Sequence, residues 1–157
     1  MIELTLFALL LVANGSPVVL SLLTRKTQKW PIDGGLCLPD GQRLFGTSKT
    51  LPGLAVAVSA TTLCSLLIGP SAWIGFLVGA FAMFGDLLSS FIKRRLGLAS
   101  GAAAVGLDQI PESLLPLLIC KPLLDLSWTQ ALLLTLAFVV ANLLISQARR
   151  MARSRQP

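Results

Sequence analysis

Histidine is missing from the sequence, and the three cysteines stand far apart at Cys37, Cys64 and Cys120. Without histidine, neither a Ser-His or Cys-His nucleophile nor a histidine-ligated metal can form. The cysteines show no CxxC spacing, so the sequence offers no zinc site. Any chemistry in this chain must therefore depend on Asp, Glu, Lys and Arg.

Charge is also scarce: 13% of the residues are charged, 54% are hydrophobic, and the mean hydropathy is +0.78. These values are typical of a membrane protein. Because a chain in lipid must satisfy its own backbone hydrogen bonds, we expect an all-α membrane protein. The expected architecture is a bundle of about five transmembrane helices with cytoplasmic catalytic loops, in one integral membrane domain over residues 1–157.

The expected spans follow from the apolar stretches and are residues 2–23, 51–68, 72–92, 113–126 and 128–146. The first is interpreted as a retained span and not as a signal peptide, because Glu3 stands where a signal peptide carries bases. The charge-free stretch from Thr50 to Gly85 is too long for one span, so Gly69-Pro70-Ser71 is the predicted turn. Small residues, Gly75, Gly79 and Ala80, are expected at helix contacts.

Basic residues predict the orientation, because Lys and Arg collect in short cytoplasmic loops. With an outside N-terminus and a cytoplasmic C-terminus, 12 of the 13 bases lie inside: five in the first inner loop, three in the second and four in the tail. We therefore expect a multi-pass protein of the cell membrane. The bases border apolar stretches, so anionic ligands and lipid headgroups, and no nucleic acid, are the expected partners.

The polar loop "DGQRLFGTSKT" at residues 40–50 is the first candidate site. A P-loop is excluded because Lys49 comes three residues after Gly46. Glycines let backbone N–H groups approach an anion, while Arg43 and Lys49 supply charge and Thr50 a donor, so a different phosphate cradle is one interpretation. A solvated turn whose bases contact anionic lipid is the other.

The stretch "GDLLSSFIKRRLG" is the second candidate, because Asp86 is an acid near the end of an apolar helix. Helical spacing places Asp86, Ser90 and Lys93 on one face. An Asp86–Lys93 or Asp86–Arg94 ion pair is the structural alternative. Asp108 and Glu112 follow on the same side of the membrane. Carboxylates without histidine favour Mg²⁺, and surrounding bases favour phosphates.

The motifs "DGxRxFGxxKTxxG" at Asp40–Gly53, "GDxxxSFxKRR" at Gly85–Arg95 and "DQ" at Asp108–Gln109 together resemble the CDP-archaeol synthase family, relatives of phosphatidate cytidylyltransferases. The resemblance implies five spans, Mg²⁺, and transfer of CMP from CTP to a membrane lipid phosphate with release of pyrophosphate. We expect catalytic roles for Lys49, Asp86, Lys93 and Asp108, with Asp86 and Asp108 as metal ligands. The residues expected to bind substrate are Asn14, Asp40, Gly41, Arg43, Gly46, Thr50, Ser90, Arg94 and Gln109.

One position departs from the family pattern: Pro111 stands where a second acid is expected after the "DQ" pair. Either Glu112 takes its place or this branch uses a different substrate. The acceptor, an archaeal-type ether lipid or a diacyl phosphatidate, is left open by the motifs, as is the oligomeric state. Two other functions are alternatives: a CDP-alcohol phosphotransferase, which also has a "DG…R" motif, and a small non-enzymatic channel, transporter or scaffold subunit.

The orientation can be tested with topology reporters. A reporter fused after Pro157 is expected to give a cytoplasmic signal, because the basic tail stays inside, and a reporter inserted at Ser71 is expected to give an outside signal. A cytoplasmic signal at Ser71 would contradict the predicted pair of spans around Gly69-Pro70-Ser71.

Overall fold

The computed structural model describes residues 1–24 and 30–154, in which the regular secondary structure is helical apart from two isolated β-bridges. The helices of this part are α1 (Ile2–Leu23), α2 (Leu51–Ile68), α3 (Ala72–Arg95), α4 (Gln109–Cys120) and α5 (Trp128–Ser154). The all-α class predicted from composition is thus confirmed.

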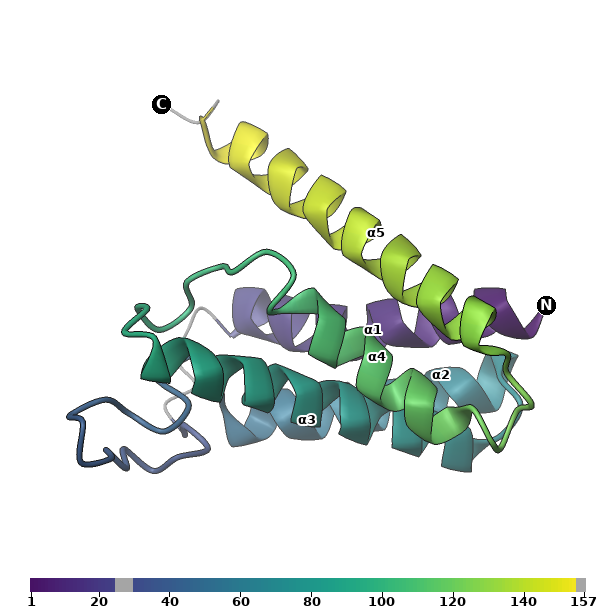
Figure 1. The fold of residues 1–157 in the computed structure, drawn as a ribbon, viewed down its shortest axis with the longest axis horizontal. Helices are drawn as coiled ribbons and strands as arrows, with labels where there is room; N and C mark the ends of the chain where they lie inside the picture. Colours follow the sequence, from purple (N-terminus) through teal and green to yellow (C-terminus); the bar gives the residue numbers. More distant parts are fainter. Residues whose placement is uncertain (25–29, 155–157) are drawn as a thin grey trace.

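The chain connects these helices at two opposite ends of the bundle (Figure 1). One end gathers residues 30–50, residues 96–108 and the C-terminal end of α5. The other end holds the N-terminus, the turn between α2 and α3, and the connection from α4 to α5. The two loops that carry the sequence motifs therefore lie at the same end of the molecule.

Helices α2 and α3 begin where a hydroxyl side chain caps them. Thr50 Oγ1 accepts a hydrogen bond from the amide of Gly53 at 3.2 Å, and Ser71 Oγ accepts one from Ile74 at 3.2 Å. These caps satisfy N–H groups that have no partner within the helix. The turn at Gly69-Pro70-Ser71 lies where the sequence predicts it, and α3 continues past the expected end at residue 92 to Arg95.

Helix α4 differs from the expected span at residues 113–126, because it begins at Gln109 and ends at Cys120. Lys121 precedes Pro122, which disfavours a continued helix, and Asp125 then adopts a positive φ of 50°. At about 1.5 Å per residue, its 12 residues cover ~18 Å, short of a ~30 Å hydrocarbon core. Among the described helices, four are long and apolar enough to cross a membrane, and α4 is a shorter helix packed among them.

Helices α2 and α3 approach closely because α3 carries glycines at the contact. A Cβ atom on Gly75 would lie 2.4 Å from Ser65 Cβ, and one on Gly79 would lie 3.0 Å from Val58 Cα. Close backbone packing through small residues is the common way in which membrane helices associate. The predicted contacts at Gly75 and Gly79 are confirmed, whereas Ala80 is only half-buried.

A third glycine places α4 against α3. A Cβ atom on Gly85 would lie 2.3 Å from the carbonyl oxygen of Pro111 and 2.8 Å from the amide nitrogen of Glu112. Because a helix backbone cannot give way as a side-chain end can, only glycine fits at this position. Gly85 therefore sets the distance between Asp86 and the first turn of α4.

The core fills the other end and the middle of the bundle. It includes Leu6, Leu9 and Leu10 of α1, Val78 of α3, and Phe138 of α5, all almost fully buried. Helix α5 is tied to α1 near its own start, where Gln130 donates a 2.7 Å hydrogen bond to Glu3. Toward its C-terminal end α5 diverges from the other helices (Figure 1).

We expect Gly85→Ala to destabilise the protein by about 1–3 kcal/mol, because the added methyl group overlaps the backbone of α4. Thermal unfolding in detergent measures the effect. Gly15→Ala is the matched control on α1, since a Cβ there meets no atom within 4 Å and alanine is the better helix former. Equal stability of the two variants would contradict the close contact between α3 and α4.

Candidate functional site

The loop at residues 30–50 is organised around the buried carboxylate of Asp33. Its oxygens accept hydrogen bonds from the guanidinium of Arg43 and from the amides of Gly35, Phe45 and Gly46 at 3.0–3.2 Å. Burial alone would raise the pKa of Asp33, but the hydrogen bonds from Arg43 and the three amides outweigh it and lower the pKa from 3.8 to about 2. Arg43 thus holds the loop in shape.

A second ion pair fastens this loop to the end of α3. Arg95 Nη1 lies 2.6 Å from a carboxylate oxygen of Asp40, and Nη2 donates a 2.8 Å hydrogen bond to the carbonyl of Arg43. The loop is therefore held from inside by Asp33 and from outside by Arg95. Its last residues, which include Lys49, are placed beside α3 as a result.

The segment after α3, residues 96–108, closes over the same end. Lys93 Nζ donates to the carbonyl of Ala102 at 3.0 Å, and Arg94 Nη2 donates to that of Ala99 at 2.7 Å. The two loops meet at Ser100, whose Oγ accepts a 3.3 Å hydrogen bond from the amide of Ser48. Gly46, at φ 92°, packs here too, since a Cβ on it would lie 2.7 Å from Ser100 Oγ.

A cavity of about 810 Å³ lies between the helices and these two loops, and we call it the large cavity. Its wall combines residues of α1, both loops, α2, α3, α4 and one residue of α5. Its polar and charged lining comprises Asn14, Ser21, Thr24, Thr47, Ser48, Lys49, Thr50, Asp86, Lys93, Asp108, Gln109, Glu112 and Asn142. This concentration of polar groups in an apolar bundle makes it the candidate site.

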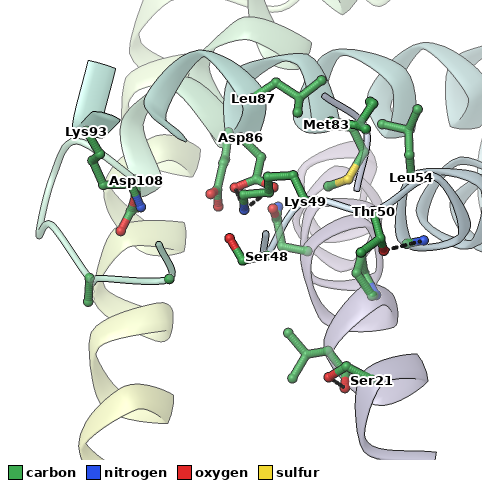
Figure 2. Close-up of a pocket in the computed structure, with 18 of the residues that line it drawn as sticks. Ser21, Ser48, Lys49, Thr50, Leu54, Met83, Asp86, Leu87, Lys93 and Asp108 are labelled. Carbon is green, nitrogen blue, oxygen red and sulfur yellow. Dashed lines mark hydrogen bonds and ion pairs between the residues drawn. The ribbon is translucent and has the colours of Figure 1, made fainter. Parts of the chain in front are cut away.

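Two lysine–aspartate pairs lie in the large cavity (Figure 2). Lys49 Nζ is 2.5 Å from both carboxylate oxygens of Asp86, and Lys93 Nζ is 2.5 Å from Asp108 Oδ1. Asp108 also accepts a 2.9 Å hydrogen bond from the amide of Ala104. Among the described residues, Asp86 thus pairs with Lys49 and not with Lys93 or Arg94, the pairs suggested by helical spacing. Each charge is neutralised locally, as burial in an apolar bundle requires.

The cavity contains the oxygen ligands that Mg²⁺ prefers. Glu112 on α4, whose backbone lies against Gly85, lines the cavity together with Asp86 and Asp108. In the described part of the chain no three acids or thiols are close enough to enclose a metal alone. Mg²⁺ usually takes one or two carboxylates and completes its shell with phosphates and water, so the residues fit that ion.

The structure divides the residues expected from the motifs into two groups. Those that line the large cavity are Asn14, Lys49, Thr50, Asp86, Lys93, Asp108 and Gln109. Those outside its wall are Asp40, Gly41, Arg43, Gly46, Ser90 and Arg94. Asp40, Arg43 and Arg94 each have a partner that holds a loop in place. Ser90 is buried on α3, and Gly41 adopts a positive φ of 75° in an exposed turn.

Two features of the site were missed by the sequence interpretation. Asp33 is not among the residues that the motifs single out, although it organises the whole first loop. Asn142 was not singled out, although it brings α5 into the cavity wall. The signal for Asn142 was available, since it is a carboxamide within an apolar span, the same signal that drew attention to Asp86.

Fold and site together define a multi-pass helical membrane protein with a charged cavity enclosed by two loops at one end of the bundle. The CarS-like CDP-archaeol synthase family matches residues 67–152, more than half of the 157-residue chain. The chain belongs to this family, as its motifs indicated.

Curated relatives agree with the family match. The CDP-archaeol synthase of Saccharolobus islandicus (strain L.S.2.15 / Lassen #1) is 44% identical over 104 residues, which cover 63% of this chain and 59% of that protein. The CDP-archaeol synthase of Thermofilum pendens is 41% identical over 106 residues, covering 63% and 51%. The chain thus matches between half and three fifths of the length of these two relatives.

A solved structure of an intramembrane enzyme for archaeal membrane lipid biosynthesis has the same fold. It superposes with a TM-score of 0.72 at 31% identity, and the match covers 90% of each chain. The similarity extends over nearly the whole bundle, including the N-terminal part that the family match at residues 67–152 leaves out.

We expect Asp33→Asn to loosen the first loop, because the charge that attracts Arg43 and three amides is lost. The rate of trypsin cleavage after Arg43 should rise about tenfold or more at pH 7. Asp40→Asn is the matched control, since its pair with Arg95 is more exposed and should change the rate less.

The pH dependence of this loop has a defined sign. Because the folded pKa of Asp33 is lowered from 3.8 to about 2, its stabilising effect is present above about pH 4 and is lost as the pH falls toward 2. An acid-active protease can measure cleavage of the wild-type loop at low pH. If the loop resists cleavage at pH 2 as well as it does above pH 4, the role of Asp33 is contradicted.

Proposed function

We propose that this chain transfers CMP from CTP to the phosphate of a membrane lipid, giving a CDP-lipid and pyrophosphate. The observation that carries the proposal is the large cavity, in which two lysines and three carboxylates meet inside a membrane bundle of this family. An oxygen of the lipid phosphate attacks the α-phosphorus of CTP. A new P–O bond forms, the bond to the β-phosphate oxygen breaks, and pyrophosphate leaves with that electron pair.

The residues of the cavity suit both substrates. Lys49 and Lys93 are the cations that neutralise phosphate oxygens, and hydroxyls and amides at residues 47–50 offer further donors. A phosphate monoester is already ionised at neutral pH, so the reaction needs no histidine as general base. Before substrate binds, each lysine is neutralised by an aspartate, which keeps the charges in place at low cost.

We propose Mg²⁺ as the cofactor, with Asp86 and Asp108 as its ligands and with Glu112 substituting for the acid that the family pattern has where Pro111 stands here. When bound, Mg²⁺ neutralises charge on the phosphates that react and leave. The chain holds Asp86 on α3 close to Asp108 and Glu112 at the start of α4, and the contact of Gly85 with Pro111 sets the distance between these two helices.

The proposed orientation places the large cavity on the cytoplasmic side of the cell membrane, where CTP is found, with the N-terminus outside. The lipid phosphate then enters from the inner leaflet. The relatives are named CDP-archaeol synthases, which favours an archaeol-type ether lipid as acceptor.

The test is an assay of purified protein with CTP, Mg²⁺ and a lipid phosphate, either archaeol-type or diacyl. Release of pyrophosphate with formation of a CDP-lipid is expected. Release of CMP from a CDP-lipid in the presence of an alcohol would instead indicate a CDP-alcohol phosphotransferase. No turnover with either acceptor, by protein that is folded, would favour the non-enzymatic alternative.

The sharpest variant is Asp86→Asn, which keeps the shape of the side chain and removes its charge. If Asp86 ligates Mg²⁺, nucleotidyl transfer should fall on the order of a hundredfold or more, and the residual activity should need more Mg²⁺. Binding of Mn²⁺, measured by electron paramagnetic resonance, should weaken in parallel. Asp125→Asn, at the opposite end of the bundle, is the matched control. Near wild-type turnover with the same Mg²⁺ midpoint would exclude Asp86 as a ligand.

A further inference from the structure

A second cavity, of about 240 Å³, lies between α1 and α5, and we call it the side cleft. It shares four residues with the large cavity: Asn14, Val18, Gln109 and Asn142. The two spaces therefore meet at this group of side chains. On α5 the side cleft is lined by Phe138, Asn142, Ile145 and Ser146. Toward its C-terminal end this helix diverges from the other helices (Figure 1).

Three of the shared residues are carboxamides, and they come from three different helices. Asn14 donates from Nδ2 to Leu10 O at 3.0 Å on α1, and Asn142 donates from Nδ2 to Phe138 O at 3.2 Å on α5. Gln109 at the start of α4 accepts from the amide of Gly106 at 2.7 Å.

Each carboxamide thus uses one polar group within its own segment. In the described part of the chain, the oxygens of Asn14 and Asn142 and the amide nitrogen of Gln109 accept or donate no side-chain hydrogen bond, and they are not among the buried unpaired polar atoms. Because the three side chains line both cavities, these groups are accessible to a polar ligand at the junction.

The chemistry of the junction differs from that of the large cavity. The lysine–aspartate pairs attract and neutralise phosphates, whereas carboxamides are uncharged and offer both donors and acceptors. On the other side of the junction, Leu11, Phe138 and Ile145 add apolar side chains to the wall of the side cleft, next to the hydroxyl of Ser146. A ligand that fits this order has a phosphate, then uncharged oxygens, then hydrocarbon.

The depth of the junction fits the same ligand. Asn14 lies nine residues before the end of α1 at Leu23, and Asp86 lies nine residues before the end of α3 at Arg95. At about 1.5 Å per residue, both are ~13 Å from those helix ends. Asn14 and Asp86 therefore lie at a similar depth, so a lipid whose phosphate reaches Asp86 has the carboxamides beside that phosphate, within reach of the next oxygens of the lipid.

We propose that Asn14, Gln109 and Asn142 bind the glycerol backbone oxygens of the lipid phosphate, with its chains leaving the bundle through the side cleft, and that Asn142 is a specificity-determining residue for the acceptor. This inference rests on the proposed function for its substrate. It assigns a role to α5, which contributes none of the charged residues of the large cavity.

The experiment compares wild type, Asn142→Leu and the control Leu144→Ala, in which the altered side chain is exposed on α5. Each full-length protein is reconstituted and given CTP with one of two acceptors. One acceptor is a glycerol-based lipid phosphate, and the other is a long-chain alkyl phosphate that lacks backbone oxygens. Binding of the glycerol-based lipid without CTP is measured in parallel by native mass spectrometry.

Wild type should prefer the glycerol-based acceptor, and Asn142→Leu should reduce that preference, as a ratio of kcat/KM values, by about five- to tenfold. The loss should appear mainly in the KM for the lipid and as weaker lipid binding. Leu144→Ala should keep the wild-type preference.

Three results would overturn the proposal. An equal loss with both acceptors would make Asn142 a structural residue. A rise in the KM for CTP, without a change for the lipid, would assign the carboxamides to the nucleotide base. Unchanged lipid binding in Asn142→Leu would exclude the contact. The wild type could bind the lipid through Asn142 and yet release no pyrophosphate from CTP. That result would support the lipid subsite and contradict the proposed transfer of CMP, so failure of the subsite can be distinguished from failure of the proposed function.

Discussion

The need to pair charges inside an apolar bundle governs this structure. Asp86 and Lys93 lie on one face of α3, but seven residues apart, which is about two turns and farther than the i,i+3 and i,i+4 pairs that meet directly on a helix. They instead bind partners from elsewhere: Lys49 from the first loop and Asp108 from the second. Each pair draws a loop over the end of the bundle, so the same interactions that neutralise the charges also build the wall of the large cavity.

Close backbone contact is the second requirement, and glycine provides it at defined points. Gly75 and Gly79 bring α2 against α3, and Gly85 brings α4 against the turn of α3 that carries Asp86. These contacts fix the separation of the helices before any ligand is present. Asp86, Lys93 and Glu112 are therefore held by helices, and Lys49 and Asp108 by loops that are paired to α3, which reduces the cost of ordering them when phosphates bind.

The motif of the first loop combines two kinds of residue that look alike in the sequence. Arg43 and Lys49 are both bases among glycines, yet Arg43 binds the buried Asp33 and Lys49 enters the large cavity. Asp40 and Asp86 are both acids of family motifs, yet Asp40 pairs with Arg95 at the surface. Arg43 and Asp40 thus shape the loop, and this shape allows Lys49 to reach the large cavity. Spacing along the chain could not separate these roles, because the separation depends on which side chain finds a buried partner.

The sequence by itself determined the class of the protein, the bounds of α1 and α2, the turn after Ile68 and the residues that bring charge to one end of the bundle. Hydropathy, capping residues and turn residues are local signals, and they act in the same way in any fold. The tertiary structure decided that α4 is short and packs among the longer helices, that Asp86 pairs with Lys49, and that Glu112 and Asn142 join the same cavity. These features depend on which helices lie side by side and how closely, and that is a property of packing between segments far apart in the chain.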